Sequence, residues 1–352
     1  MIPHNKPTPG KEEAAAAARV LRSHWVAQGF EVKKFEDAVC RYLGLPAGHA
    51  VAASSGTASL YLTLTALNVR KGSEVIIPSY VCSAVLNAVN MTGATPVLAD
   101  IEPDTLNISF ADVKKKINPT TAAIVVTHTF GMPADVAPFM ELGILVIEDC
   151  AQAIGASVGG RSVGITGTVA IFSFYATKMI TTGYGGMVAS KDEALIERVR
   201  DYREFDGRQT YEPRFNFQMS DINAAIGLAQ LKKLPAFLKK RAAAAKVYAA
   251  VVPADSLWPE QGNKTAKPNL YRILVRTERA KELKEFLGKK GVSTIIPIEQ
   301  FELLHRYLHE DPEQFPESEA AAENLLSLPA YPSLSPAELR KISAALREFF
   351  GV

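Results

Sequence analysis

Short apolar runs alternate with helix-like segments from about residue 30 to about residue 235. The apolar runs occupy 74–78, 95–100, 122–128, 143–149, 169–174 and 185–190, and helical spacing marks 31–44, 80–92 and 110–117. Most runs are continuously apolar rather than alternating, which is typical of strands covered on both faces. Repeated β-α units favour a doubly wound, mainly parallel sheet, so we expect an α/β fold.

The pattern changes near residue 235. A long helical segment over 230–252 contains Pro235, and shorter strand-like runs follow at 270–277 and 292–298. Helical segments are predicted at about 278–289, 299–309, 317–326 and 336–349. We therefore expect two domains: a large domain over 1–235, with an N-terminal arm, and a smaller α+β domain over 236–352.

Composition narrows the class of protein. The chain has 352 residues, of which 47% are hydrophobic, and a net charge of +2. No basic block and no membrane-length apolar run occurs, so we expect neither nucleic acid nor a membrane as a partner. The N-terminus lacks a secretory-signal pattern. Three widely spaced cysteines, with no disulfide or zinc spacing, predict a reducing cytoplasmic location.

Polar residues follow the ends of several predicted strands. In an open parallel sheet, ligands bind outside the carboxyl ends of the strands, so these residues should share one site. The stretch 50–69 starts as a short strand-like run and continues as a predicted helix, which a Ser-Ser-Gly-Thr turn at 54–57 opens. Its backbone N–H groups suit a phosphate, although a serine helix cap, which needs no ligand, is the more common reason for such a turn. The residues in question are Gly56, Thr57, Tyr80, Cys82, His128, Asp149, Gln152, Ser173 and Lys178.

These residues are uninformative singly and informative together. Lys178 alone reads as a solvated lysine, Asp149 as a helix cap and His128 as a packed or hydrogen-bonded histidine. A pyridoxal phosphate enzyme, however, needs a lysine for the imine, a carboxylate on the ring nitrogen and a phosphate cup. The sequence places candidates for all three at successive strand ends.

Four stretches then carry a family resemblance: "SSGTASL", "VIEDCAQAIGA", "FSFYATKMITTGYGGMV" and "FNFQMSDINAAIGLAQL". The chain resembles the DegT/DnrJ/EryC1/StrS family of pyridoxal-phosphate-dependent sugar aminotransferases over nearly its whole length. That resemblance implies the aspartate aminotransferase fold (fold type I) and a homodimer whose two active sites lie at the interface. It also implies an imine with the cofactor at Lys178 and a ring-nitrogen contact at Asp149.

The resemblance assigns further contacts. Gln152 falls beside the cofactor ring, while Ser173, Gly56 and Thr57 fall on phosphate ligands. Asn216 falls on an asparagine that reaches the phosphate of the neighbouring subunit.

Three positions depart from the family pattern. Cys82 stands where an aromatic residue usually stacks on the ring, and Tyr80, two residues earlier, is a candidate substitute. Tyr184 replaces a usual glutamate, and Gln218 replaces an arginine that helps with anionic substrate groups. We expect His128, Tyr184 and Gln218 on the substrate side, where the departures concentrate.

The expected activity is transfer of an amino group from glutamate or glutamine to a keto sugar, nucleotide-linked by resemblance and serving polysaccharide biosynthesis. One alternative is a pyridoxal-phosphate-dependent sugar dehydratase, but such relatives replace the imine lysine, and Lys178 argues against it. Another is a cofactor-binding regulatory protein without turnover. We expect no metal, because His305 and His309 have i,i+4 spacing but no carboxylate that completes a known metal motif.

Overall fold

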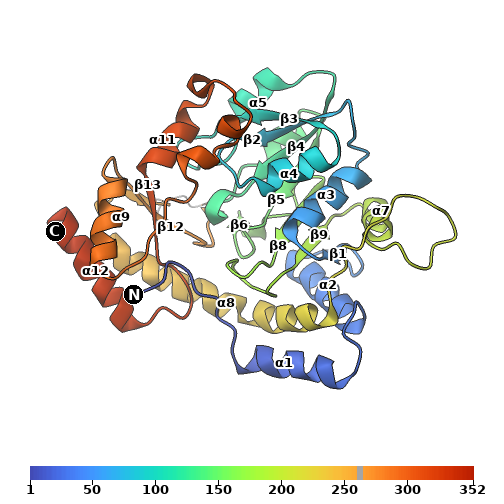
Figure 1. Ribbon diagram of the computed structural model, residues 1–352, viewed down its shortest axis with the longest axis horizontal. Coiled ribbons are helices and arrows are strands. Elements are labelled where there is room, and N and C mark those ends of the chain that lie inside the picture. Colours follow the sequence, from blue (N-terminus) through green and yellow to red (C-terminus); the bar gives the residue numbers. More distant parts are fainter. Residues whose placement is uncertain (260–264) are drawn as a thin grey trace.

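The computed structural model describes residues 1–259 and 265–352. A large sheet with strand order β1-β9-β8-β5-β4-β2-β3 forms the centre (Figure 1). Strands β3, β2, β4, β5 and β8 are parallel neighbours, and β9 is antiparallel to both β8 and β1. The strands are β1 Ala50–Ala53, β2 Glu74–Pro78, β3 Thr95–Ala99, β4 Thr121–Thr127, β5 Leu145–Asp149, β8 Val169–Ser173 and β9 Gly186–Ala189. The predicted mainly parallel α/β sheet is confirmed.

Both faces of this sheet are covered, which explains the continuously apolar strands. In β8, Val169 and Ile171 join one core cluster, whereas Ala170 and Phe172 join the cluster on the opposite face. All four side chains are buried. The covering helices are α2 Phe30–Leu43, α3 Gly56–Ala66, α4 Ala84–Met91, α5 Phe110–Lys116, α6 Ala137–Met140 and α7 Glu193–Arg203.

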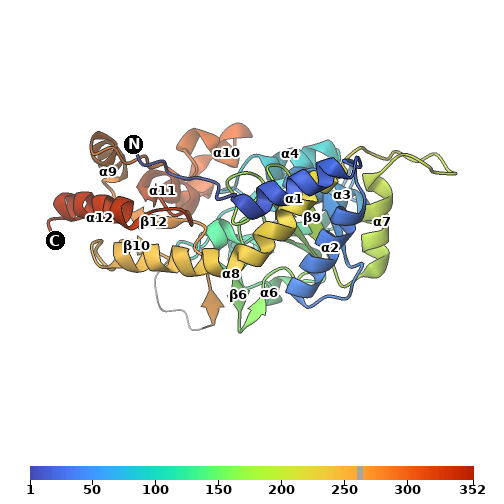
Figure 2. The same cartoon turned by 90° about the horizontal axis from the view of Figure 1, so that it is seen from below.

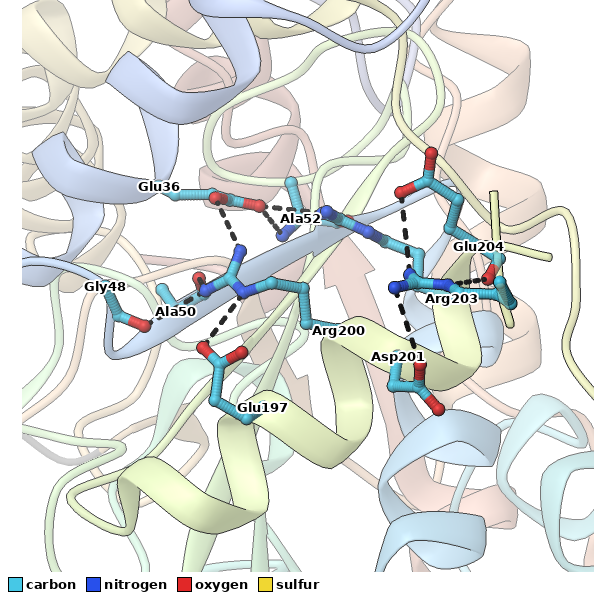
Figure 3. A network of polar contacts seen from close by, with 10 residues as sticks. Glu36, Gly48, Ala50, Ala52, Glu197, Arg200, Asp201, Arg203 and Glu204 are labelled. Atoms are coloured by element: carbon cyan, nitrogen blue, oxygen red, sulfur yellow. Dashed lines mark hydrogen bonds and ion pairs between the residues drawn. The ribbon is translucent and has the colours of Figure 1, made fainter. Parts of the chain in front are cut away.

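A charged network fixes α2 and α7 against β1 (Figure 3). Glu36 of α2 accepts from Arg203 Nη1 at 2.8 Å and lies 3.3 Å from Arg200 Nη1. The same Glu36 accepts from the Ala52 amide at 2.8 Å. Because Arg203 is buried, the paired carboxylate offsets the cost of removing its charge from water.

Helix α8, Asp221–Ala249, connects the two main parts of the chain (Figures 1 and 2). It runs without a break through Pro235, contacting α1 Lys11–Arg22 at one end and α12 Pro336–Phe350 towards the other. One smaller sheet has the order β10-β12-β13, with β10 Leu257–Trp258, β12 Ile273–Arg276 and β13 Leu325–Leu328. Another has the order β11-β6-β7, with β11 Ala266–Lys267, β6 Ser157–Val158 and β7 Arg161–Ser162. The boundary at 235 stays a prediction.

The predicted strand at 292–298 is wrong. Val292 makes a single bridge with Ile2, and Ile295 makes a single bridge with Ser327. The segment therefore bridges two different partners at one residue each and forms no continuous ladder. Pro297 also lacks the N–H that would extend one. The predicted helix at 299–309 is also shorter, because a 3₁₀ turn at Gln300–Glu302 precedes α10 Leu304–Tyr307. Helices α9 Ala280–Lys289 and α11 Pro316–Asn324 lie close to the predicted positions.

Candidate active site

A cavity of about 490 Å³ opens at the carboxyl ends of the parallel strands. It lies where β2, β4, β5 and β8 end, as the topology of an open sheet leads us to expect. The sequence-predicted residues that line it are Gly56, Thr57, Tyr80, Cys82, His128, Asp149, Gln152, Ser173, Lys178 and Tyr184. Asn216 and Gln218 are not among its lining residues.

Asp149 ends β5 and pairs in register with Thr127 of β4 and Ile171 of β8. Its Oδ1 accepts from the Ala151 amide at 2.9 Å, and its carboxylate has no other hydrogen bond within the described residues. Burial raises the pKa of Asp149, against the opposing influence of the Ala151 amide and of Lys178. The site thus holds a buried acid that lacks a full set of partners.

Lys178 lies five residues beyond β8, in a turn closed by its amide, which donates to the Tyr175 carbonyl at 2.9 Å. Its Nζ is 5.5 Å from the centroid of the Tyr271 ring. Burial raises the pKa of the Tyr271 phenol, but the charges of Lys178, Arg272 and Arg241 and a hydrogen bond with Thr177 together hold that pKa below its usual range. Lys178 is therefore half-buried beside an aromatic face rather than solvated on a loop.

The turn at 54–57 brings a helix N-terminus against the end of β8. Ser55 caps α3, accepting from the Ala58 amide at 3.1 Å. The first amides of a helix have no intrahelical acceptor and therefore point at any anion placed there. A Cβ on Gly56 would lie 2.8 Å from Ser173 Cβ, so only glycine allows this close approach.

His128 is buried and both of its ring nitrogens are engaged. Nδ1 accepts from the Ala134 amide at 2.9 Å, so Nε2 carries the hydrogen that it donates to Glu148 at 3.0 Å. The ring has no free nitrogen for a substrate in this arrangement. The substrate role of His128 remains a prediction, and its contacts describe a histidine that braces the ends of β4 and β5.

Glu148 and Cys150 complete a buried cluster with His128 whose potential ligand atoms lie within 4.8 Å of one another. The Glu148 carboxylate already accepts from the amides of Gly164, Thr166 and Gly167 at 2.6–2.8 Å. These contacts account for the carboxylate without a cation.

Tyr80 and Cys82 both line the cavity but differ in environment. Tyr80 is fully buried, meets Phe130 edge-on at 6.0 Å between ring centroids, and has no hydrogen-bond partner for its hydroxyl within the described residues. Cys82 is exposed.

Gln152 is held in place by a backbone contact: the Phe130 amide donates to Gln152 Oε1 at 2.9 Å.

Asn216 lies on the connection between α7 and α8, which extends away from the body of the protein (Figures 1 and 2). Its neighbours Phe215 and Phe217 pack on Tyr61 of α3, with ring centroids 5.1 and 6.1 Å apart. Asn216 itself is exposed. The aromatic pair fixes the segment while leaving the asparagine directed outside its own cavity.

Sequence reasoning missed part of the lining. Tyr271 and Arg272 face the same space. The stretch 270–277 was identifiable as strand-like, but nothing in its pattern marks which residues reach a cavity formed mainly by residues 55–184.

The residues present fit pyridoxal phosphate. The Gly56–Ser173 approach shapes a phosphate cradle, the underpartnered Asp149 suits a cationic ring nitrogen, and Lys178 supplies an amine in the same cavity. These features are independent of one another. Each matches a different part of the cofactor.

Comparison with known proteins agrees with this geometry. The sequence model of the DegT/DnrJ/EryC1/StrS aminotransferase family matches residues 7–347. The aminotransferase TlmJ from Streptoalloteichus hindustanus is 32% identical, with a TM-score of 0.92, and the match covers 100% of this chain and 99% of TlmJ.

Two further structures are similar over nearly their whole length. Helicobacter pylori PseC, an aminotransferase involved in the biosynthesis of pseudoaminic acid, is 27% identical with a TM-score of 0.88, covering 99% of this chain and 98% of PseC. Spr1654 of Streptococcus pneumoniae, described as a sugar aminotransferase and solved in its PLP form, is 25% identical with a TM-score of 0.90, covering 99% and 98%. The chain belongs to the DegT/DnrJ/EryC1/StrS aminotransferase family and is a pyridoxal-phosphate-dependent aminotransferase.

Proposed function

We propose that this protein transfers an amino group from glutamate or glutamine to a nucleotide-linked keto sugar. The observation that carries the proposal is the meeting of Lys178, the buried Asp149 and the Gly56–Ser173 cradle in one cavity. The three cysteines are free, in keeping with action in the cytoplasm. Among the residues that the structure describes, no helix has the length and apolar character needed to cross a membrane.

Each residue has a distinct task in this proposal. Pyridoxal phosphate supplies a carbon that exchanges amines and a ring that accepts electron density. Lys178 Nζ would hold the cofactor and would move a proton to and from the reacting carbon of the substrate. The Asp149 carboxylate would keep a proton on the ring nitrogen, because a buried anion and a neighbouring cation stabilise each other. The presence of Lys178 favours transamination over sugar dehydration.

We further propose that the active unit is a homodimer in which Asn216 reaches the cofactor phosphate of the neighbouring subunit. Asn216 is exposed and outside the cavity of its own chain, although the flanking phenylalanines are packed. Large exposed aromatic side chains, including Trp25, Phe30 and Tyr211, add apolar surface that a second subunit would cover.

Isotope transfer tests the proposed reaction. The cofactor-loaded protein is incubated with glutamate or glutamine labelled with ¹⁵N at the α-amino group and with a panel of nucleotide-linked and free keto sugars, including an inositol-type ketone. Mass spectrometry should find the label in one amino sugar, and Lys178→Ala should give none. Label that enters no member of the panel, or that enters equally in Lys178→Ala, would contradict the proposal.

A further inference from the structure

We propose that Arg272 binds the α-carboxylate of the amino donor, an assignment that rests on the proposed function and deepens it. Arg272 directly precedes β12 and lines the cavity beside Tyr271. The Arg272 Cζ lies 5.3 Å from the Tyr271 ring centroid, and Lys178 Nζ lies 5.5 Å from the same centroid. Lys178, at the expected reaction centre, and the permanent positive charge of Arg272 therefore both lie near the same aromatic ring.

Arg272 forms no ion pair with an acid among residues 1–259 and 265–352. Its Nη1 meets His4 Nε2 and Ser327 Oγ, both at 3.3 Å, and its Nε is buried without a hydrogen-bond partner. His4 stays a neutral acceptor, because burial and the charges of Arg272 and Arg241 lower the pKa of His4 to about 3. The contacts orient the guanidinium and leave its charge unbalanced.

Two other arginines with a buried, unpartnered Nε show how a structural arginine is satisfied here. Arg203 pairs with the Glu36 carboxylate. Arg241 directs Nη1 to the carbonyls of Leu270, Tyr271 and Ala330. Neither of these arginines lines the cavity, whereas Arg272 does. Its missing counter-charge is therefore expected from a ligand.

The identity of that anion follows from the other charges in the cavity. Asp149 is the one acid among the lining residues, and in the proposed reaction its carboxylate pairs with the ring nitrogen of the cofactor. Every α-amino acid donor carries a carboxylate one bond from the carbon at which Lys178 acts. A planar guanidinium matches a carboxylate with two parallel hydrogen bonds. Gln218, where the family resemblance places a substrate-side arginine, lies outside this cavity, so Arg272 supplies the cation from another element.

Single-turnover absorbance measurements on the cofactor-loaded protein test the assignment with three donors of one skeleton. L-Glutamate and L-glutamine both retain the α-carboxylate, whereas L-isoglutamine carries a neutral α-amide. In Arg272→Gln, the half-saturating concentration of the first two should rise about 10- to 100-fold, the loss expected for a charge-assisted hydrogen-bonded pair. The value for L-isoglutamine, already weak, should change little. Arg272→Lys should recover only part of the loss, because an ammonium lacks the two-pronged geometry.

Arg276→Gln is the matched control, because Arg276 ends β12, the strand that Arg272 directly precedes, and lies outside the cavity. It should behave as the parent protein, and cofactor uptake and thermal melting should confirm that all variants fold. Equal half-saturating concentrations in parent and Arg272→Gln would overturn the assignment. So would a loss shared by L-glutamate and L-isoglutamine but absent for L-glutamine, which would place Arg272 on the side-chain carboxylate. A parent protein that binds the cofactor but reacts with none of the three would overturn the proposed function itself.

Discussion

The cavity has two walls that are built differently. Its strand-end wall, comprising Tyr80, His128, Asp149 and Ser173, follows consecutive parallel strands of one sheet. Its C-terminal wall, comprising Tyr271, Arg272, Pro297 and Ile298, is held by segments far apart in the chain: His4 near the N-terminus and Ser327 of β13 both contact Arg272. Backbone ladders position the first wall, and side-chain contacts position the second.

The charges of the two walls also differ. The strand-end wall presents a buried carboxylate, Asp149, whereas the C-terminal wall presents an unbalanced cation, Arg272. In our account the acid serves the cofactor and the cation serves the amino donor. The residues proposed for cofactor chemistry are thus positioned by the sheet. The residue proposed for donor recognition belongs to a wall whose position depends on packing between distant segments.

Removing the acid of the strand-end wall should have the largest effect. Asp149→Ala leaves the ring nitrogen without its counter-charge, so electron density from the reacting carbon is poorly stabilised. Turnover should fall at least about 100-fold, since each ~1.4 kcal/mol lost from the transition state is tenfold in rate. Cofactor attachment at Lys178, followed by absorbance, should survive. Near-parental turnover would mean that another carboxylate faces the ring.

The second-largest effect should come from crowding the Gly56–Ser173 phosphate cradle of the same wall. In Gly56→Ala the added Cβ would lie 2.8 Å from Ser173 Cβ, so the end of β8 or the start of α3 must shift. Overpacking of this kind costs about 1–3 kcal/mol, which corresponds to roughly 5- to 150-fold weaker cofactor binding in a titration. Gly288→Ala in α9, where no atom lies within 4 Å of the new Cβ, is the control. Unchanged affinity in Gly56→Ala would place the phosphate elsewhere.

A substitution of Asn216 tests whether a second subunit contributes to the strand-end wall. Asn216→Ala should weaken cofactor retention about tenfold, as expected for one lost hydrogen bond to a charged group, while light scattering still reports a dimer. A parent protein that is monomeric and retains cofactor stoichiometrically would refute the shared site. In that case both walls would belong to one chain.

The smallest effect concerns His4, which supports the C-terminal wall. Burial, Arg272 and Arg241 lower the pKa of His4 to about 3, against about 6.5 for an exposed histidine. Well above pH 6.5, His4 is neutral whether the N-terminal segment 2–8 is packed or released. As the pH falls below 6.5, His4 takes up a proton in the released segment first. The packed segment should therefore lose roughly 1–2 kcal/mol of stability between pH 7 and pH 5.

Hydrogen exchange of residues 2–8, expressed as protection factors, measures this loss. His4→Gln should remove the pH dependence, and His24→Asn, at an exposed position, should not. Equal pH dependence in parent and His4→Gln would assign the effect to another group.

The sequence was sufficient for the strand-end wall because the carboxyl ends of parallel strands meet at one edge, so Asp149, Ser173 and Lys178 could be grouped before any distance was known. It was insufficient where position depends on long-range packing. The segment 292–298 looks like a strand, but bridges Ile2 and Ser327 singly. Arg272 looks like any strand arginine, and only its contacts with His4 and Ser327 and the absence of an acid within the described residues distinguish it.

His128 illustrates a further limit of sequence reasoning. Its place at a strand end is visible in the sequence, and that place allows either a packed, hydrogen-bonded histidine or a substrate contact. The engagement of both ring nitrogens by Ala134 and Glu148 depends on folded geometry. A residue can thus be assigned to the site while its role there stays open.

Borohydride reduction followed by peptide mapping shows which lysine carries the cofactor. The protein is loaded with pyridoxal phosphate, reduced, digested and analysed by mass spectrometry. We expect the cofactor mass on the peptide that contains Lys178 and on no other peptide. Lys178→Arg should bind the cofactor without covalent label, because an always-protonated guanidinium does not form the bond. Label on another lysine, or transamination by Lys178→Arg at the parental rate, would contradict the account.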